Sequence, residues 1–160
     1  MKIIFLDIDG VMNSMESAKQ FHTYHRAAPS AVAALNCILR NDESIQIVIS
    51  STWRELHSLD YITGWLEGNG VIRCRVLDKT CSLNGADRGE EITAWIREHD
   101  ITSYVVLDDD AWKMVDHQAR FINTDFRVGL TIEDARRANF ILAIPFFGFP
   151  TPNQLTTERK

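Results

Sequence analysis

Two aspartates one residue apart, Asp7 and Asp9, follow an apolar run that begins at Ile3. A short apolar run bounded by turn residues is typical of a buried strand in a parallel sheet. Gly10 allows the backbone to turn sharply just after the acids. Two carboxylates at a buried strand end need compensation, and Mg²⁺ would supply it because it prefers carboxylate oxygens.

Polar side chains also follow two later apolar runs. Ser50 and Ser51 come directly after residues 45–49, and Asp108 and Asp109 come directly after residues 104–107. Each cluster alone has an ordinary structural explanation as a turn, a cap or a solvated loop. Three such clusters in succession, each after a predicted strand, indicate instead one shared site.

This set of side chains favours phosphoryl chemistry. Asp7, Asp108 and Asp109 would repel one another, so a divalent cation is needed to keep them ionised. A phosphate monoester could bridge the cation, the Ser50 hydroxyl and backbone N–H groups at the strand–helix turns. One carboxylate could then attack phosphorus, and a second acid two residues later could carry the proton.

Strands alternate with helices along the rest of the chain. This alternation predicts a doubly wound parallel α/β sheet with helices on both faces, whose ligands bind beyond the carboxyl ends of the strands. Further strands are expected at 71–77 and at 121–122, and the first of these is expected at an edge of the sheet. Helices are expected over 29–40, with Ser30 as N-cap, and over 56–66. A third helix is expected to start after Asp87, which is its N-cap and forms a capping box with Glu90. A last helix is expected over 131–142, with Thr131 as cap.

The length of 160 residues suits one domain, which we place at 1–144 and follow with a C-terminal tail at 145–160. Residues 11–28 show no clear periodicity and are interpreted as a flap or loop, in which His22 and His25 are solvated. So short a flap, and the short stretch after Arg54, leave no room for a large cap. We therefore expect a minimal cap or none. The site would then be open and could admit the end of a macromolecule.

Composition narrows the function classes. The net charge of −5 argues against a long nucleic-acid footprint, and no apolar run reaches the roughly 20 residues of a membrane span. Three cysteines without a CxxC spacing predict neither a disulfide framework nor a zinc site. We expect a cytoplasmic protein without a stable protein partner.

The motifs FLDIDGV, IVISS and VVLDDD resemble motifs I, II and IV of the haloacid dehalogenase (HAD)-type phosphotransferases. The resemblance covers nearly the whole chain and implies an Mg²⁺-dependent phosphatase with a Rossmann-like core. It makes Asp7 the nucleophile and a metal ligand, and Asp9 the general acid/base that also offers its backbone carbonyl to the metal. It implies that Ser50 binds the phosphoryl group, while Asp108 and Asp109 hold the metal.

Motif III departs from the family pattern, which has a lysine at the start of the helix before motif IV. That helix here begins with Arg88, which could clamp a phosphate with a different reach and geometry. Lys79, in the preceding loop, is the competing candidate. We favour Arg88 and leave Lys79 open.

A finer resemblance is carried by ISSTWR, RGEEITAWI, YVVLDDD and a later GLT. These segments are similar to the small HAD domains associated with RNA-repair proteins. That similarity implies a phosphorylated small molecule such as a nucleotide, or a phosphorylated nucleic-acid end, as substrate. Ser51 and Arg54 would then assist phosphate binding, and Trp53 could stack on a base or pack in the core.

Two other functions remain open. The substitution at motif III is compatible with a catalytically silent module that only binds phosphate and magnesium. A receiver-type phospho-acceptor domain is less favoured, because the first strand ends in DxD rather than in adjacent acids. A dinucleotide-binding domain is disfavoured because no GxGxxG follows a predicted strand.

Overall fold

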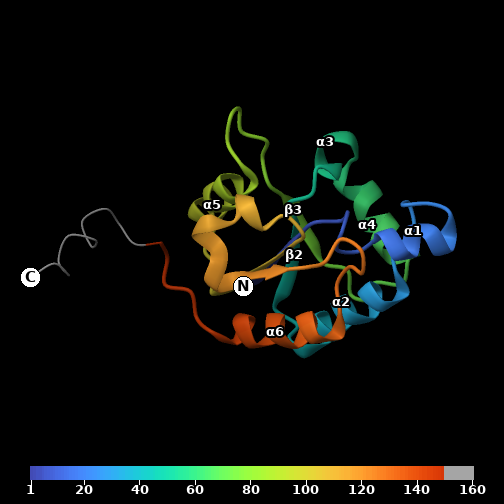
Figure 1. The fold of residues 1–160 in the computed structure, drawn as a ribbon. Helices are drawn as coiled ribbons and strands as arrows, with labels where there is room; N and C mark the ends of the chain where they lie inside the picture. Colours follow the sequence, from blue (N-terminus) through green and yellow to red (C-terminus); the bar gives the residue numbers. More distant parts are fainter. Residues whose placement is uncertain (150–160) are drawn as a thin grey trace, which may run out of the picture.

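The structure, a computed structural model, describes residues 1–149, and these form a three-layer α/β fold (Figure 1). Its sheet is parallel throughout and has the strand order β3-β2-β1-β4-β5, which confirms the predicted fold class. This order is that of the Rossmann sheet and differs from the 2-1-3-4-5 order of receiver-type domains, so it argues against that alternative. The strands are β1 (Lys2–Leu6), β2 (Ile45–Ile49), β3 (Val76–Lys79), β4 (Ser103–Asp108) and β5 (Phe121–Asn123).

Helices cover both faces of the sheet. They are α1 (Met15–Phe21), α2 (Pro29–Asn41), α3 (Trp53–Leu56), α4 (Leu59–Gly68), α5 (Arg88–Glu98) and α6 (Ile132–Ala143), with 3₁₀ helices η1 (Ala111–Lys113) and η2 (Val115–Arg120). In β1, Ile4 and Leu6 point into the core shared with α2, α4 and α6, whereas Ile3 and Phe5 point into the core shared with α5. This alternation is the period-2 pattern of a strand buried on both faces. None of the helices among the described residues is long and apolar enough to cross a membrane.

The capping signals located two helices correctly and one incorrectly. Asp87 and Glu90 form the predicted capping box of α5, and the predicted cap Thr131 of α6 forms a capping box with Asp134. Ser30 is not a cap: α2 begins one residue earlier at Pro29, and its N-cap is Ala28. Proline at the first helical position explains the difference, because its fixed φ suits a helix start and its missing N–H leaves no donor to cap.

Three other boundaries also differ from expectation. Residues 11–28, which we expected to be a loop, contain α1, because Ser14 and Ser17 form a capping box that starts this helix. The helix predicted from Leu56 is divided into α3 and α4, because Ser58 caps a new helix. The predicted strand 71–77 begins only at Val76, after a turn in which Arg73 has a φ of 48°, but β3 is the edge strand that we expected.

The first part of the predicted tail, residues 145–149, lies against the α5 side of the sheet. Phe146 and Phe149 pack against this second core, and the Phe146 N–H donates to the carbonyl of Thr102. Arg120 donates to the carbonyl of Pro145 at 2.8 Å. The rest of the predicted tail, residues 150–160, lies outside the described residues.

Candidate active site

The parallel register brings the three polar clusters to one edge of the sheet. Leu6 of β1 is level with Ile49 of β2 and with Leu107 of β4, so the next residues, Asp7, Ser50 and Asp108, stand side by side. Backbone hydrogen bonds continue this alignment, from Asp7 N–H to the carbonyl of Leu107 and from Ser50 N–H to the carbonyl of Leu6. The strand ends therefore position the candidate residues without help from a long loop.

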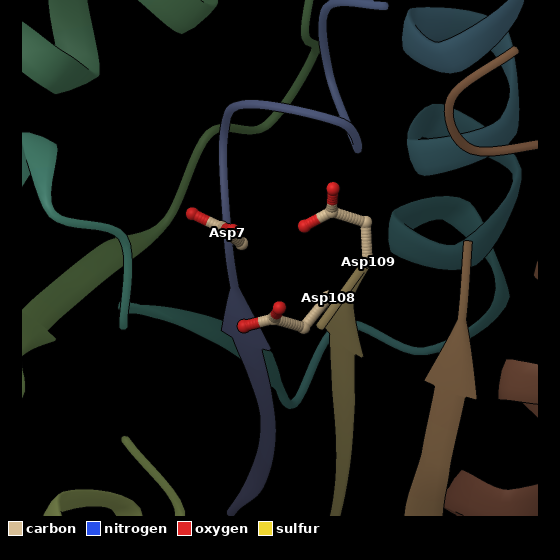
Figure 2. Close-up of side chains that lie close together, drawn as sticks. All are labelled: Asp7, Asp108 and Asp109. Atoms are coloured by element: carbon tan, nitrogen blue, oxygen red, sulfur yellow. The ribbon is translucent and has the colours of Figure 1, made fainter. Parts of the chain in front are cut away.

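Three carboxylates face one another at this edge (Figure 2). Asp7, Asp108 and Asp109 each offer one oxygen within 4.8 Å of the others, and Asp7 and Asp108 are buried. Burial and the charge of Asp7 raise the pKa of Asp108 to about 6 and also raise the pKa of Asp109. A cluster of oxygen donors in which Asp108 and Asp109 resist ionisation fits a hard divalent cation, which would stabilise their ionised forms.

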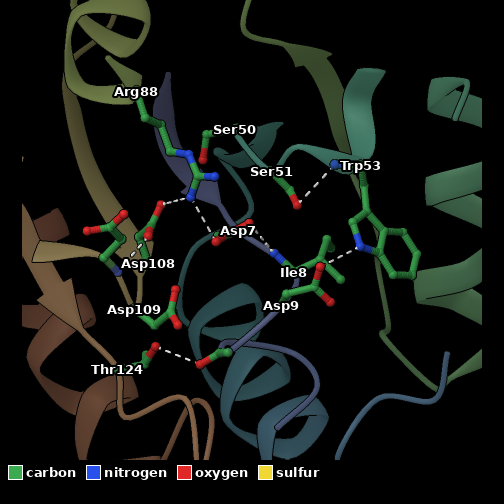
Figure 3. Close-up of polar contacts among 12 residues, drawn as sticks. Asp7, Ile8, Asp9, Ser50, Ser51, Trp53, Arg88, Asp108, Asp109 and Thr124 are labelled. Carbon is green, nitrogen blue, oxygen red and sulfur yellow. Dashed lines mark hydrogen bonds and ion pairs between the residues drawn. The ribbon is translucent and has the colours of Figure 1, made fainter. Parts of the chain in front are cut away.

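Arg88 lies between two of these carboxylates (Figure 3). Its Nη1 donates to Oδ2 of Asp7 at 2.8 Å and to Oδ2 of Asp108 at 2.5 Å. Burial lowers the pKa of the Arg88 guanidinium, but the charges of Asp7 and Asp108 outweigh it and raise this pKa above its usual value. The guanidinium therefore stays charged at the centre of the site.

Lys79, the other candidate for the motif III cation, points elsewhere. Its Nζ donates to the backbone carbonyl of Arg54 at 2.8 Å. The structure thus brings Arg88, and not Lys79, to Asp7 and Asp108. The capping box of α5 explains why, because it fixes Arg88 at the first helical position beside the strand ends.

The two serines after β2 differ in their surroundings. Ser50 is fully buried, and its Oγ has no hydrogen-bond partner among residues 1–149. The Oγ of Ser51 accepts a hydrogen bond from the N–H of Trp53 at 3.4 Å. A buried hydroxyl without a partner is costly, so Ser50 offers an unused donor to a bound oxyanion.

Arg54 binds the backbone of these two serines. Its Nη1 donates to the carbonyls of Ser50 and Ser51 at 2.6 and 2.9 Å. Its Nη2 forms an ion pair with Glu91 of α5, and both side chains are less than a tenth exposed. We expected Arg54 to contact phosphate, but the structure instead uses its terminal nitrogens to join the β2 turn to α5.

The turn after β1 requires the glycine that the sequence supplies. Gly10 has a φ of 76°, and a Cβ built on it would lie 2.4 Å from Oδ2 of Asp109. Thr124, just beyond β5, donates from its hydroxyl to the carbonyl of Gly10 at 2.8 Å. The missing side chain therefore lets the turn lie against the carboxylate cluster.

Asp9 stands apart from the carboxylate cluster and is exposed. Its Oδ2 accepts a hydrogen bond from the indole Nε1 of Trp53 at 2.9 Å, and its Oδ1 accepts one from Nδ2 of Asn13 at 2.7 Å. Figure 3 shows its carboxylate turned toward Trp53 and away from Asp108 and Asp109. The first two acids of the chain therefore have different surroundings although only Ile8 separates them.

Three contributors were not found from the sequence. Asn13 and Glu91 carry no sequence signal for a role at the site. Asn13 meets Asp9 only through the fold of the turn after β1, and Glu91 meets Arg54 only through the packing of α5 against α3. Thr124 could have been found, since it follows the fifth strand as the other site residues follow theirs. Trp53 was considered for base stacking, but it is 8% exposed and its ring packs against Trp65.

The comparisons with known proteins point to one family. The family model described as "HAD domain in Swiss Army Knife RNA repair proteins" matches residues 3–135. Neither the curated proteins nor the solved structures contain a match to the chain. The matched range includes Asp7, Ser50, Arg88 and Asp108, the residues that the strand ends and α5 bring together.

Proposed function

The chain belongs to the family of HAD domains in Swiss Army Knife RNA repair proteins, and from this premise we propose that it hydrolyses phosphate monoesters with Mg²⁺. Membership supports a HAD-type hydrolase or phosphatase in general. The observation that carries the finer proposal is the arrangement of Asp7 between Ser50 and Asp108, with Arg88 bound to both acids.

The side chains of Asp7, Asp108 and Asp109 would hold Mg²⁺, with the backbone carbonyl of Asp9 as the further ligand that the family resemblance implies. Bound Mg²⁺ supplies charge neutralisation at the phosphoryl oxygens. Arg88 contributes a fixed positive charge at the same place, and the unpaired hydroxyl of Ser50 contributes a hydrogen-bond donor.

The proposed reaction has two steps. A carboxylate oxygen of Asp7 attacks phosphorus, the bond from phosphorus to the leaving oxygen breaks, and Asp9 gives its proton to that oxygen. Water then attacks the phosphorus of the aspartyl-phosphate, Asp9 takes a proton from this water, and the bond to Asp7 breaks. The products are an alcohol and inorganic phosphate.

The proposed substrate is a nucleotide or a phosphorylated nucleic-acid end. Two observations support it, namely the family's description as part of RNA repair proteins and the lack of a large inserted cap among residues 1–149. The net charge of −5 favours a short ligand over a long nucleic acid, since long polyanions bind through many basic contacts.

A magnesium- and phosphate-binding module without turnover is the second candidate. The contact of Arg88 with Oδ2 of Asp7 favours it, because a cation bound to the nucleophile opposes its attack on phosphorus. In the active enzyme, the phosphoryl oxygens would have to share this guanidinium. The two candidates therefore differ in whether Asp7 becomes free to react.

One assay distinguishes the two. We expect phosphate release from p-nitrophenyl phosphate and from 3′- or 5′-nucleotides with Mg²⁺, and its loss with EDTA or in Asp7→Asn. Arg88→Ala should lose turnover, whereas Lys79→Ala should keep it, because Lys79 donates to a backbone carbonyl. Magnesium and phosphate binding by calorimetry without turnover on any substrate would instead establish the binding module.

A further inference from the structure

The two oxygens of the Asp9 carboxylate are both held by uncharged N–H donors. Trp53 donates to Oδ2 from the α3 side, and Asn13 donates to Oδ1 from the turn after β1. Among the described residues, Asp9 forms no ion pair, whereas Asp7 and Asp108 are both paired with Arg88. Its orientation is therefore set by these two neutral partners.

Trp53 is itself firmly placed. It begins α3, its N–H donates to Oγ of Ser51, and its carbonyl accepts from the N–H of His57. The indole ring lies 4.9 Å from the ring of Trp65 and 5.4 Å from that of His57, measured between centroids. The direction of its N–H bond is thus fixed by packing rather than by Asp9.

Asn13 is fixed in the same way. It is fully buried, and its Oδ1 accepts from the N–H of Gly10 at 3.2 Å. Its Nδ2 donates both to Asp9 and to the carbonyl of Tyr24 at 2.8 Å. Since the Gly10 N–H and the Tyr24 carbonyl require opposite ends of the amide, the N–H group must face Asp9.

We propose that Trp53 and Asn13 are positioning residues for proton transfer by Asp9. An ionised carboxylate has about two lone-pair sites on each oxygen. One site on each oxygen receives Trp53 or Asn13, so one on each remains for the proton that passes to the leaving oxygen. Because Asp9 is exposed, these remaining sites are open to a substrate.

This inference rests on the proposed function and adds a statement about substrate class. Proton donation is important when the leaving group is a basic alkoxide, as from a sugar hydroxyl, and unimportant for an acidic phenol such as p-nitrophenol. The enzyme's natural substrates would then be alkyl phosphates, and a defect in Asp9 positioning would lower kcat/KM on them alone, because kcat/KM ends at departure of the leaving group and excludes the later step with water.

Trp53→Phe removes the N–H donor and keeps an aromatic ring, and Trp65→Phe is the matched control. Trp65 is in the same ring cluster, but its Nε1 donates to the carbonyl of His25 rather than to Asp9. On a nucleoside monophosphate, we expect Trp53→Phe to lower kcat/KM about 10-fold or more, which is part of the 10²–10⁴-fold typical of a general acid. On p-nitrophenyl phosphate the loss should stay below about 3-fold, and Trp65→Phe should keep the wild-type ratio of the two rates.

Equal losses on both substrates, or an unchanged or increased rate on the nucleotide, would overturn the positioning role. A wild-type protein without turnover on either substrate would overturn the proposed function instead, so the two failures are distinguishable. In an Asp9→Asn background, Trp53→Phe should have no further effect on the ratio of the two rates, because the indole acts through Asp9.

A second measurement does not depend on folding of a Trp53 variant. The chain has four tryptophans, whose indole N–H groups give separate signals in a ¹⁵N-labelled NMR spectrum. Asp9→Ala should move the Trp53 indole signal and leave the Trp95 signal in place, since the Trp95 N–H donates to Asp78 on the other side of the sheet. A spectrum in which no indole signal moves would contradict the contact on which the proposal stands.

Discussion

Asp7 and Asp9 occupy neighbouring positions of one turn, yet their environments are opposite. Asp7 is buried, lies against Asp108 and forms an ion pair with Arg88. Asp9 is exposed and is held by the neutral donors of Trp53 and Asn13. A buried carboxylate beside other acids suits attack on phosphorus once the phosphoryl oxygens share its cation, whereas an exposed one with free lone pairs suits proton transfer.

The largest expected effect separates these two roles. Asp7→Asn removes the nucleophile and should lower turnover by about 10⁴-fold or more on every substrate. Asp9→Asn should lower kcat/KM about 10²–10⁴-fold on a nucleotide and much less on p-nitrophenyl phosphate. Steady-state kinetics on both substrates measures the difference. Equal losses for the two variants on both substrates would contradict the separate roles of Asp7 as nucleophile and Asp9 in proton transfer.

The Arg54–Glu91 ion pair stabilises the surroundings of both Asp7 and Asp9. Arg54 binds the turn after β2, which carries Ser50 beside Asp7 and leads to Trp53, the partner of Asp9. Glu91→Gln removes the buried charge partner of Arg54 and leaves only the exposed Glu55 at 3.9 Å, so it should cost about 3–5 kcal/mol in free energy of unfolding. Denaturant unfolding provides the measurement.

The matched control is Glu133→Gln. The Glu133–Arg136 pair joins two side chains that are each 69% exposed, so its loss should cost less than about 0.5 kcal/mol. Similar costs for Glu91→Gln and Glu133→Gln would mean that the buried pair does not hold this region together.

Gly10 tests how closely the turn approaches the carboxylate cluster. Gly10→Ala puts a Cβ 2.4 Å from Oδ2 of Asp109 at a φ of 76°, and we expect it to cost about 1–3 kcal/mol in free energy of unfolding. Gly64→Ala, inside α4, adds a Cβ with nothing within 4 Å beyond the helix's own backbone, and should instead stabilise by about 0.5–1 kcal/mol. Thermal unfolding of both variants gives the comparison, and a stable Gly10→Ala protein would contradict the close approach.

The smallest expected effect is a pH dependence of Mg²⁺ binding. The pKa of Asp108 is raised to about 6 from 3.8, so between these values the folded protein holds a proton that the unfolded chain has lost. This group therefore makes the metal-free protein less stable as pH rises through that window. Because Mg²⁺ needs the ionised carboxylate, the increase in Tm caused by Mg²⁺ should be larger at pH 7.5 than at pH 5.

Asp108→Asn should remove most of this dependence on pH. An Mg²⁺-induced shift in Tm that is the same at both pH values in the unaltered protein would contradict the placement of the ion at Asp108.

The sequence was informative where function depends on strand ends and helix caps. Asp7, Ser50, Asp108 and Arg88 each stand at the end of a strand, or directly after a strand or a cap, whose pattern is local, so their convergence could be predicted. The partners of Asp9 could not, because the contacts of Asn13 and Trp53 depend on how the turn and α3 pack in three dimensions. For the same reason, the pairing of Arg54 with Glu91 became visible only in the folded chain.

The central claim is that Asp7 carries the phosphoryl group during turnover. Acid quenching of the protein during hydrolysis of a ³²P-labelled nucleotide with Mg²⁺ measures this directly, with the labelled peptide identified by mass spectrometry. We predict label on the peptide that contains Asp7 in the unaltered protein and none in Asp7→Asn. Steady turnover by the unaltered protein with no label on the peptide that contains Asp7 would contradict the claim.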